Sequence, residues 1–166
     1  MKSLTTRRAI VYGTLVVGAL DLLDAVVFFG LRGATPIRIL QSIASGLLGR
    51  SAFSGGVAAA ALGVALHFLI AFLIVATYML ASRRIGALTR APIWSGLAYG
   101  VVVYLVMNLV VVPLLAAARS PFSWPVVING IVIHMLGVGL PSGLFASAAT
   151  RRHASSSIDA RVGGRA

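Results

Sequence analysis

The sequence predicts an all-α fold, a four-helix transmembrane bundle with a short interfacial helix in its first outer loop. Two observations predict it. Of the 166 residues, 59% are hydrophobic and only 10% are charged, whereas an ordinary soluble domain has about 25% charged residues. Four apolar stretches are each long enough to cross roughly 30 Å of hydrocarbon as a helix. A water-soluble fold is therefore excluded.

The predicted spanning helices cover residues 9–31, 57–81, 93–117 and 126–149. Trp94 and Trp124 stand at the starts of the third and fourth helices, where indole rings favour the headgroup layer. Residues 1–150 form one integral-membrane domain in this interpretation. The remaining stretch, 151–166, is polar and rich in Ser and Gly, which predicts a disordered cytoplasmic tail.

A fifth helix is predicted over residues 36–48, inside the first outer loop. Thr35 supplies an N-cap and Pro36 a first-turn proline, and apolar residues then recur at helical spacing. Gln41 and Ser45 fall on the opposite, polar face. We expect this helix to lie in the outer interface or to dip into it, and to end near Gly46 or Gly49.

The 14 Lys and Arg residues set the predicted topology. Ten lie before the first helix, between the second and third helices, or after the fourth, and four lie in the other two connections. The positive-inside rule then places both termini in the cytoplasm. The net charge of +11 does not indicate a nucleic-acid partner, because these residues do not gather on one soluble face. The lipid bilayer is the predicted partner.

Polar side chains occur inside all four predicted spans. Counted from the ends of each helix, one residue per span falls within one or two turns of the bilayer midplane. Asp24 joins them as an i,i+3 neighbour on the first helix, and two tyrosines follow the same helix faces. Intramembrane ionisable residues are costly and usually mark proton, ion or ligand pathways. The candidate site residues are Asp21, Asp24, His67, Tyr78, Tyr104, Asn108 and His134.

Small residues beside these polar groups predict close helix packing. Gly96 and Gly100 have the GxxxG spacing that lets membrane helices approach, and His134 lies between Gly130 and Gly137. We expect these glycines to bring the polar side chains together in one layer.

Three functional interpretations stay open. The leading one is a small proton-linked transporter or permeation protein, with Asp21 and Asp24 as proton or cation acceptors and His67 and His134 as their partners. The second is a cofactor-binding protein: the same four residues make an O2N2 set for a divalent metal such as zinc, iron or manganese, and the two histidines are candidate axial ligands of haem b. The third is a structural or assembly protein whose polar layer only holds the helices together.

An enzyme is not the expected class. The sequence has no nucleophile elbow, no HExxH and no phosphate-binding loop. It also has no cysteine, so redox chemistry would need a bound cofactor, and none is the leading expectation. A homo-oligomer and a small-molecule or ion ligand stay open as partners.

Several residues of the last three spans form a recognisable series. They are His67 with Tyr78 eleven positions later, the run Gly96, Gly100, Asn108 and Pro113, the loop residues Pro121, Phe122 and Trp124, and His134. On these residues, the stretch 57–145 resembles the second half of YagU-like inner-membrane proteins of bacteria. The resemblance implies a bacterial inner-membrane location and supplies no mechanism. It does not extend to the first span, so Asp21 and Asp24 inherit no role from it.

Overall fold

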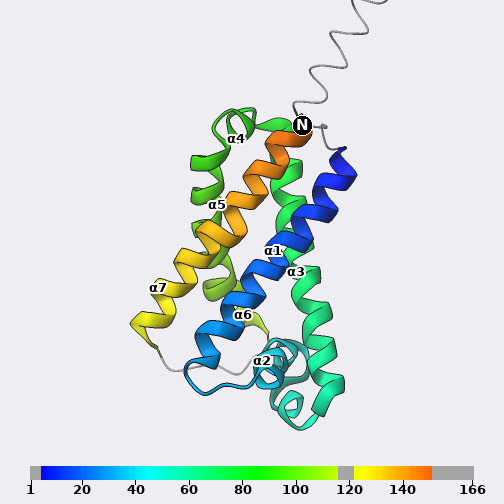
Figure 1. Ribbon diagram of the computed structural model, residues 1–166, viewed down its shortest axis with the longest axis vertical. Helices are drawn as coiled ribbons and strands as arrows, with labels where there is room; N and C mark the ends of the chain where they lie inside the picture. The colour runs from blue at the N-terminus through cyan, green and yellow to red at the C-terminus, as the bar shows by residue number, and fades with distance from the viewer. Residues whose placement is uncertain (1–4, 116–121, 151–166) are drawn as a thin grey trace, which may run out of the picture.

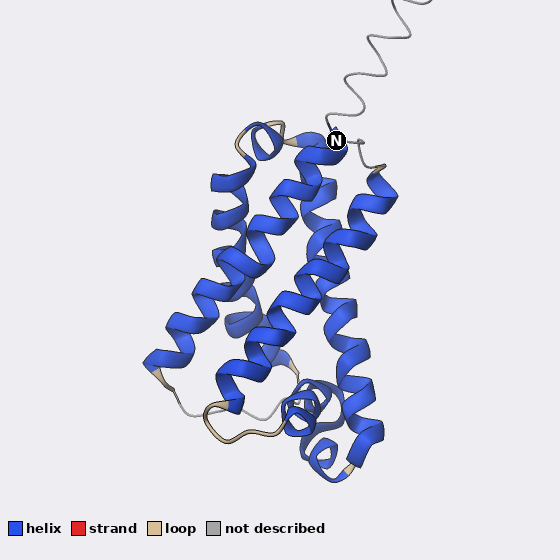
Figure 2. Cartoon of the chain, viewed as in Figure 1, coloured by secondary structure: helices blue, strands red, loops and turns tan. Residues whose placement is uncertain are grey.

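The computed structural model describes residues 5–115 and 122–150, and these residues are helical apart from short connections (Figure 2). Four helices are long and apolar enough to cross a membrane: Thr6–Gly30, Gly56–Arg84, Pro92–Leu114 and Trp124–Thr150. The predicted four-helix transmembrane bundle is confirmed, with each described boundary within three residues of its predicted position. The predicted end of the third helix at residue 117 and the predicted tail, 151–166, lie outside the described residues.

Two of the spans are interrupted by π-helical segments. In chain order the elements are α1 (Thr6–Gly30), α2 (Pro36–Leu48), the 3-10 helix η1 (Gly49–Ser54), α3 (Gly56–Arg84), α4 (Ala87–Arg90), α5 (Pro92–Val106), the π-helix η2 (Met107–Val111), α6 (Val112–Leu114), α7 (Trp124–Ile133) and the π-helix η3 (His134–Gly139). The third span is therefore α5, η2 and α6. The fourth span is α7, η3 and a further helical stretch that runs to Thr150.

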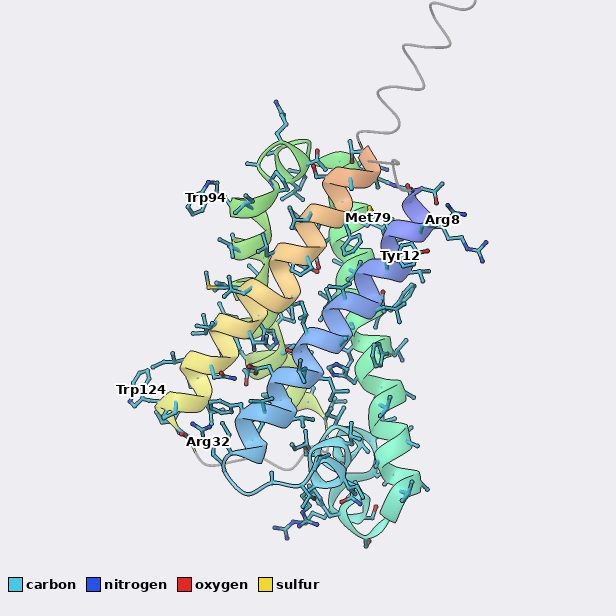
Figure 3. The ribbon with its side chains drawn as sticks, viewed as in Figure 1. Arg8, Tyr12, Arg32, Met79, Trp94 and Trp124 are labelled. Carbon is cyan, nitrogen blue, oxygen red and sulfur yellow. The ribbon has the colours of Figure 1, made fainter. Side chains whose placement is uncertain are left out.

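The four spans run antiparallel to their neighbours along the chain (Figure 1). The start of α1, the end of α3, the start of α5 and the end of the fourth span lie together, and we call this the termini end. The opposite end, which holds α2 and η1, is called the α2 end. Trp94 lies at the termini end and Trp124 at the α2 end (Figure 3). Both indole side chains are exposed, as the headgroup position predicts.

Glycine contacts join the third and fourth spans near the termini end. A Cβ at Gly100 would overlap the carbonyl of His134, and one at Gly139 would overlap the backbone of Gly96 and Gly100. The predicted pair Gly96 and Gly100 therefore does make a close helix approach, the packing that membrane helices use in place of a hydrophobic driving force. In the fourth span the partner of this pair is Gly139, at the end of η3. The predicted Gly137 does not make the contact, because a Cβ there would first meet the Ile133 side chain of its own helix.

Buried apolar side chains fill the rest of the termini half. One cluster is formed by Val17, Ala71, Val75, Val103 and Val138, and it takes one residue or more from each of the four spans. A second cluster lies closer to the termini end and is formed by Ala9, Tyr78, Met79, Ala146 and Ala149. This half of the bundle is therefore a packed membrane-protein core.

The predicted helix over 36–48 is confirmed residue for residue as α2. The side chain of Thr35 accepts a hydrogen bond from the Arg38 N–H, at 3.3 Å, and Gly49 ends the helix with a φ of 59°, a conformation that favours glycine. The helix packs against α3 so closely that a Cβ at Gly63 would overlap the carbonyl of Leu40. It is thus a wall of the bundle at the α2 end.

The predicted polar face of α2 is wrong in part. Gln41 is 4% exposed and Ser45 is fully buried, although both were expected opposite the apolar face. Gln41 donates from Nε2 to the carbonyl of Gly56 at 3.0 Å, which ties α2 to the start of α3. The hydroxyl of Ser45 donates to the carbonyl of Ser42 at 2.6 Å. Buried polar groups are tolerated where they find such partners, so polarity alone did not reveal the side that faces water.

Prolines explain the two π-helical segments. Pro113 and Pro141 lack a backbone N–H, and their rings clash with the carbonyl four residues earlier. Each proline comes directly after a wider, π-helical turn. The N–H of Val112 bonds to the carbonyl of Met107, and the N–H of Leu140 bonds to the carbonyl of Met135. Such π-bulges adjust the helix locally and often accompany functional sites.

The outward faces of all four spans carry large apolar side chains. Leu23, Leu69, Leu109 and Leu136 are each more than half exposed. In water this surface would be a costly apolar patch, whereas hydrocarbon tails cover it without cost. The fold thus defines an integral membrane protein whose spanning helices contact the lipid bilayer.

Candidate functional site

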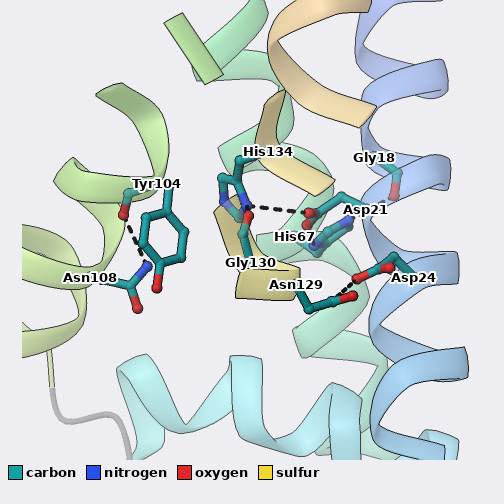
Figure 4. Close-up of polar contacts among 9 residues, drawn as sticks. All are labelled: Gly18, Asp21, Asp24, His67, Tyr104, Asn108, Asn129, Gly130 and His134. Carbon is teal, nitrogen blue, oxygen red and sulfur yellow. Dashed lines mark hydrogen bonds and ion pairs between the residues drawn. The ribbon is translucent and has the colours of Figure 1, made fainter. Parts of the chain in front are cut away.

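The centre of the candidate site is a carboxylate between two imidazoles. Asp21 on α1 places Oδ2 4.0 Å from Nδ1 of His67 on α3, and Oδ1 4.0 Å from Nδ1 of His134 at the start of η3. Figure 4 shows the Asp21 side chain between the two rings. Three of the four spans therefore contribute one ionisable residue each to one cluster. The separation exceeds hydrogen-bonding distance and is typical of an ion pair or a water-bridged contact.

Backbone carbonyls determine which ring nitrogens carry hydrogen. Nε2 of His67 lies 2.8 Å from the carbonyl oxygen of Gly18, and Nδ1 of His134 lies 2.8 Å from that of Gly130. A carbonyl oxygen only accepts, so both nitrogens are donors. In the neutral ring of His67, the lone pair is on Nδ1 and faces Asp21. In the neutral ring of His134, the nitrogen nearest Asp21 carries hydrogen.

With these tautomers, the two histidines present different groups to Asp21. The carboxylate of Asp21 is attracted to the Nδ1–H of His134 on one side and faces the Nδ1 lone pair of His67 on the other. The three groups thus form one polar cluster, with each imidazole 4.0 Å from the Asp21 carboxylate.

Two glycines position the histidines. A Cβ at Gly18 would meet the ring of Phe68 at 2.5 Å, and one at Gly130 would meet the ring of Tyr104 at 2.5 Å. The ring of Tyr104 packs edge to face against that of His134, with centroids 5.5 Å apart. Gly130 therefore makes room for the tyrosine that orients His134, and its own carbonyl fixes the ring nitrogen.

Asp24 belongs to a separate pair. Its Oδ2 accepts a hydrogen bond of 2.7 Å from Nδ2 of Asn129 on α7, and Asp24 does not line the cavity that holds Asp21. The sequence interpretation placed Asp24 with Asp21 and overlooked Asn129. The missed signal was the antiparallel order of the first and fourth spans. Asp24 lies closer to the α2 end than Asp21, and Asn129 lies closer to the α2 end than His134. Two antiparallel helices with this order predict two successive contacts between them.

Asn108 and Tyr78 do not join the cluster. Asn108 is exposed and donates from Nδ2 to the carbonyl of Tyr104, at 2.9 Å, on its own helix. Tyr78 lies eleven residues beyond His67, about 16 Å along α3. Its hydroxyl donates to the carbonyl of Leu88 at 3.0 Å and lies 2.8 Å from Oγ of Ser95. Tyr78 thus joins α3 to the start of the third span at the termini end.

A cavity of about 510 Å³ opens beside the cluster. Most of its lining is apolar, and it ends toward the termini at the buried side chains of Val17, Ala71 and Val138. Toward the α2 end it reaches Arg38, whose guanidinium lies 4.4 Å from the ring centroid of Phe53. The polar residues that line it are Asp21, Arg38, Ser42, His67, Asn108 and His134. Its size suits a small-molecule ligand.

The donor geometry does not fit a metal ion. Within residues 5–115 and 122–150, no group of three or more His, Cys, Asp or Glu residues could hold one. The Nδ1–H of His134 is bonded to the carbonyl of Gly130, and Asp24 accepts a hydrogen bond from Asn129. Haem ligation by both histidines fits no better, because the Asp21 carboxylate stands between the two rings and Nε2 of His67 is bonded to Gly18.

Comparison with known proteins adds no relative. No family model, no curated protein and no solved structure matches this chain. The class of protein therefore rests on the structure of this chain alone. It is a four-span helical membrane protein with an Asp-His-His cluster beside a cavity. The resemblance to YagU-like proteins stays a prediction.

Proposed function

We propose that this protein is a small proton-linked transporter or permeation protein. The observation that carries the proposal is Asp21, which lies between two imidazoles on the wall of a cavity. Carboxylates and histidines inside a membrane are costly unless they pair, and in pumps and transporters they serve as proton relays. A cavity beside them gives a ligand access to the same groups.

The proton step connects Asp21 with the two histidines, each 4.0 Å away, so that a bridging water or a small side-chain movement carries the proton. When Asp21 is ionised, its charge is balanced by a proton on either histidine. When Asp21 holds the proton, the Nδ1 lone pair of His67 lies 4.0 Å away, at the distance of one bridging water. Entry of a charged or hydrogen-bonding ligand changes which of these arrangements is most stable, and this links ligand occupancy to proton binding.

The helix arrangement supports a change in cavity shape. The spans form two packed groups: α1, α2 and α3 contact one another, and α5 packs along the fourth span. The cavity is lined by residues of both groups. Asp21–His134 and Asp24–Asn129 connect the two groups. Ligand sites at such an interface, near the membrane centre, are the usual arrangement in transporters that rock one group against the other.

The proposed location is the bacterial inner membrane, with both termini in the cytoplasm. The distribution of arginines supports this orientation. Among the described residues, five arginines lie at the termini end, namely Arg7, Arg8, Arg83, Arg84 and Arg90, and three lie at the α2 end, namely Arg32, Arg38 and Arg50. This is the direction that the positive-inside rule requires. The cavity would then open toward the outer side, and the protein would act without enzymatic chemistry.

The test is proton flux in reconstituted vesicles that contain a pH-sensitive dye. The variant Asp21→Asn keeps the shape of the side chain and removes its proton-accepting charge, so we expect at least a tenfold loss of flux. Asp24→Asn is the matched control, because Asp24 lies one turn away on the same helix and does not line the cavity. Wild-type flux in Asp21→Asn, or equal losses in both variants, would contradict the proposal.

A structural or assembly role is the second candidate. It is favoured by the bond between Asn129 and Asp24 and by the backbone partner of each histidine, since such contacts also hold membrane helices together. In that case Asp21→Asn and His67→Ala lower the melting temperature in detergent, and the wild-type protein produces no flux above that of empty vesicles.

A further inference from the structure

A second groove lies at the termini end, between α1 and α3. Its lining residues are Thr6, Arg7, Ile10, Val11, Phe72 and Arg83. It shares none of them with the cavity beside Asp21. The groove combines two guanidinium groups with an apolar track, and an inference drawn from it is independent of proton transport.

The two arginines have no protein counter-charge in the described part of the chain. Both ion pairs found there join histidines to Asp21. The whole chain has only three acidic residues, and the two within the described ranges, Asp21 and Asp24, lie in the middle of α1. The balancing anion for Arg7 and Arg83 must therefore come from outside these residues.

We propose that this groove binds one anionic phospholipid, with its phosphate between Arg7 and Arg83 and an acyl chain along Ile10, Val11 and Phe72. Guanidinium groups bind phosphate through two parallel hydrogen bonds. The long stems of arginine lie along apolar surface while the charged ends reach the headgroup layer. Basic pockets between membrane helices are typical places for anionic headgroups.

The membrane itself is the source of this ligand. A free phosphate would contact only the two arginines, whereas a phospholipid also places an acyl chain against the apolar part of the lining. A headgroup without net negative charge leaves one positive charge uncompensated for each arginine. The groove therefore selects a lipid with a net negative headgroup over a zwitterionic lipid of the same chain length.

The test is a binding titration of the purified full-length protein in mild detergent, followed by native mass spectrometry. The probes are phosphatidylglycerol and phosphatidylcholine with identical acyl chains, and inorganic phosphate. We expect phosphatidylglycerol to bind at least tenfold more tightly than phosphatidylcholine. Phosphate at the same concentration should not displace it. Each arginine near the surface is worth roughly a fivefold factor.

The variant Arg7→Ala/Arg83→Ala should lose most of this preference, at least tenfold. Its matched control is Arg8→Ala/Arg84→Ala, which removes the same charge from the same end of the same helices but leaves the groove lining intact. Equal losses in the two double variants would mean diffuse attraction and would overturn the proposal. So would equal binding of the two lipids, or displacement of lipid by phosphate alone.

If the alanine variant does not fold, Arg7→Lys/Arg83→Lys replaces it, because lysine keeps the charge and loses the planar fork. We then expect binding of phosphatidylglycerol to weaken several-fold. Unchanged binding in this variant would contradict the proposed phosphate contact. A second copy of the chain seated in the groove would appear in the same spectra as a dimer that lipid does not dissociate, and this would also overturn the proposal.

Discussion

The two halves of this bundle are packed in different ways. Near the termini end, glycines bring backbones into contact and small apolar residues such as Ala9 and Val75 are fully buried or nearly so. Toward the α2 end, the spans enclose a cavity of about 510 Å³, and α2 forms one of its walls. Ionisable groups occur at the junction, where Asp21 lies 4.0 Å from each histidine. A rigid half thus supports a half with room for a ligand, which is the arrangement that functional sites require.

The largest expected effect is at the glycine contact. Gly139→Ala places a methyl group against the backbone of Gly96 and Gly100, and backbone cannot move aside as a flexible side chain can. We expect a loss of about 3 kcal/mol or more of stability, measured by thermal unfolding in detergent. Gly30→Ala is the control, because a Cβ there meets nothing within 4 Å. If the two variants melt together, the termini half is not packed as described.

Adding side-chain volume to each half of the bundle tests the difference in packing directly. Ala9→Leu overfills a site that is fully buried, and such overpacking costs typically 1–3 kcal/mol. Ala25→Leu adds the same volume to the wall of the cavity, where space exists, so we expect unchanged or increased stability together with reduced flux in vesicles. Equal destabilisation by the two substitutions would show that the cavity is not available space.

The pair between Asp24 and Asn129 allows a double-mutant cycle. Asn129→Leu leaves the half-buried Asp24 carboxylate without its amide donor, and we expect a loss near the lower end of the roughly 1–3 kcal/mol that a fully buried unsatisfied group costs. Replacing both residues by leucine removes the donor and the charge, so we expect much of the stability to return. The measurement is the unfolding free energy of the wild type, both single variants and the double variant. Strictly additive losses would argue against a direct bond.

The smallest expected effect concerns the tyrosine network at the termini end. Tyr78→Phe removes the hydroxyl that donates to the carbonyl of Leu88 and contacts Ser95. Hydrogen bonds between membrane helices contribute about 0.6 kcal/mol on average, so a fall of roughly this size is expected in thermal unfolding. Tyr12→Phe, at a half-exposed ring, should leave stability unchanged. A loss of flux in Tyr78→Phe without a change in stability would extend the site to Tyr78.

The spans were predictable because their signal is long and needs only composition. Twenty apolar residues in a row have few alternatives to a membrane helix. The start of α2 was equally clear, since Thr35 and Pro36 each serve a backbone need at a helix start, and of the two glycines predicted to end it, Gly49 does so. These features depend on neighbours in the sequence, so no tertiary contact had to be known.

The candidate site was only partly predictable. Counting depth from the helix ends brought Asp21, His67 and His134 to one level, and the structure places them in one cluster. The same count placed Asn108 there, but Asn108 bonds to the carbonyl of Tyr104 on its own helix and lines the cavity without a contact to Asp21. The partner of Asp24 required knowledge of which helices are neighbours, and no periodicity within one helix contains that information.

The π-helical segment η3 makes the length of the fourth span critical. Each hydrogen-bonded turn of η3 contains one residue more than a turn of α-helix, and the segment runs from His134 to Gly139. Rewinding the same six residues as regular α-helix, without removing one, would rotate one end of the span against the other by about 100°. Either the imidazole would swing away from Asp21 or the glycine would leave its contact with α5. Chains that share this design should therefore vary in length in their connections, while the five-residue step from histidine to glycine is kept.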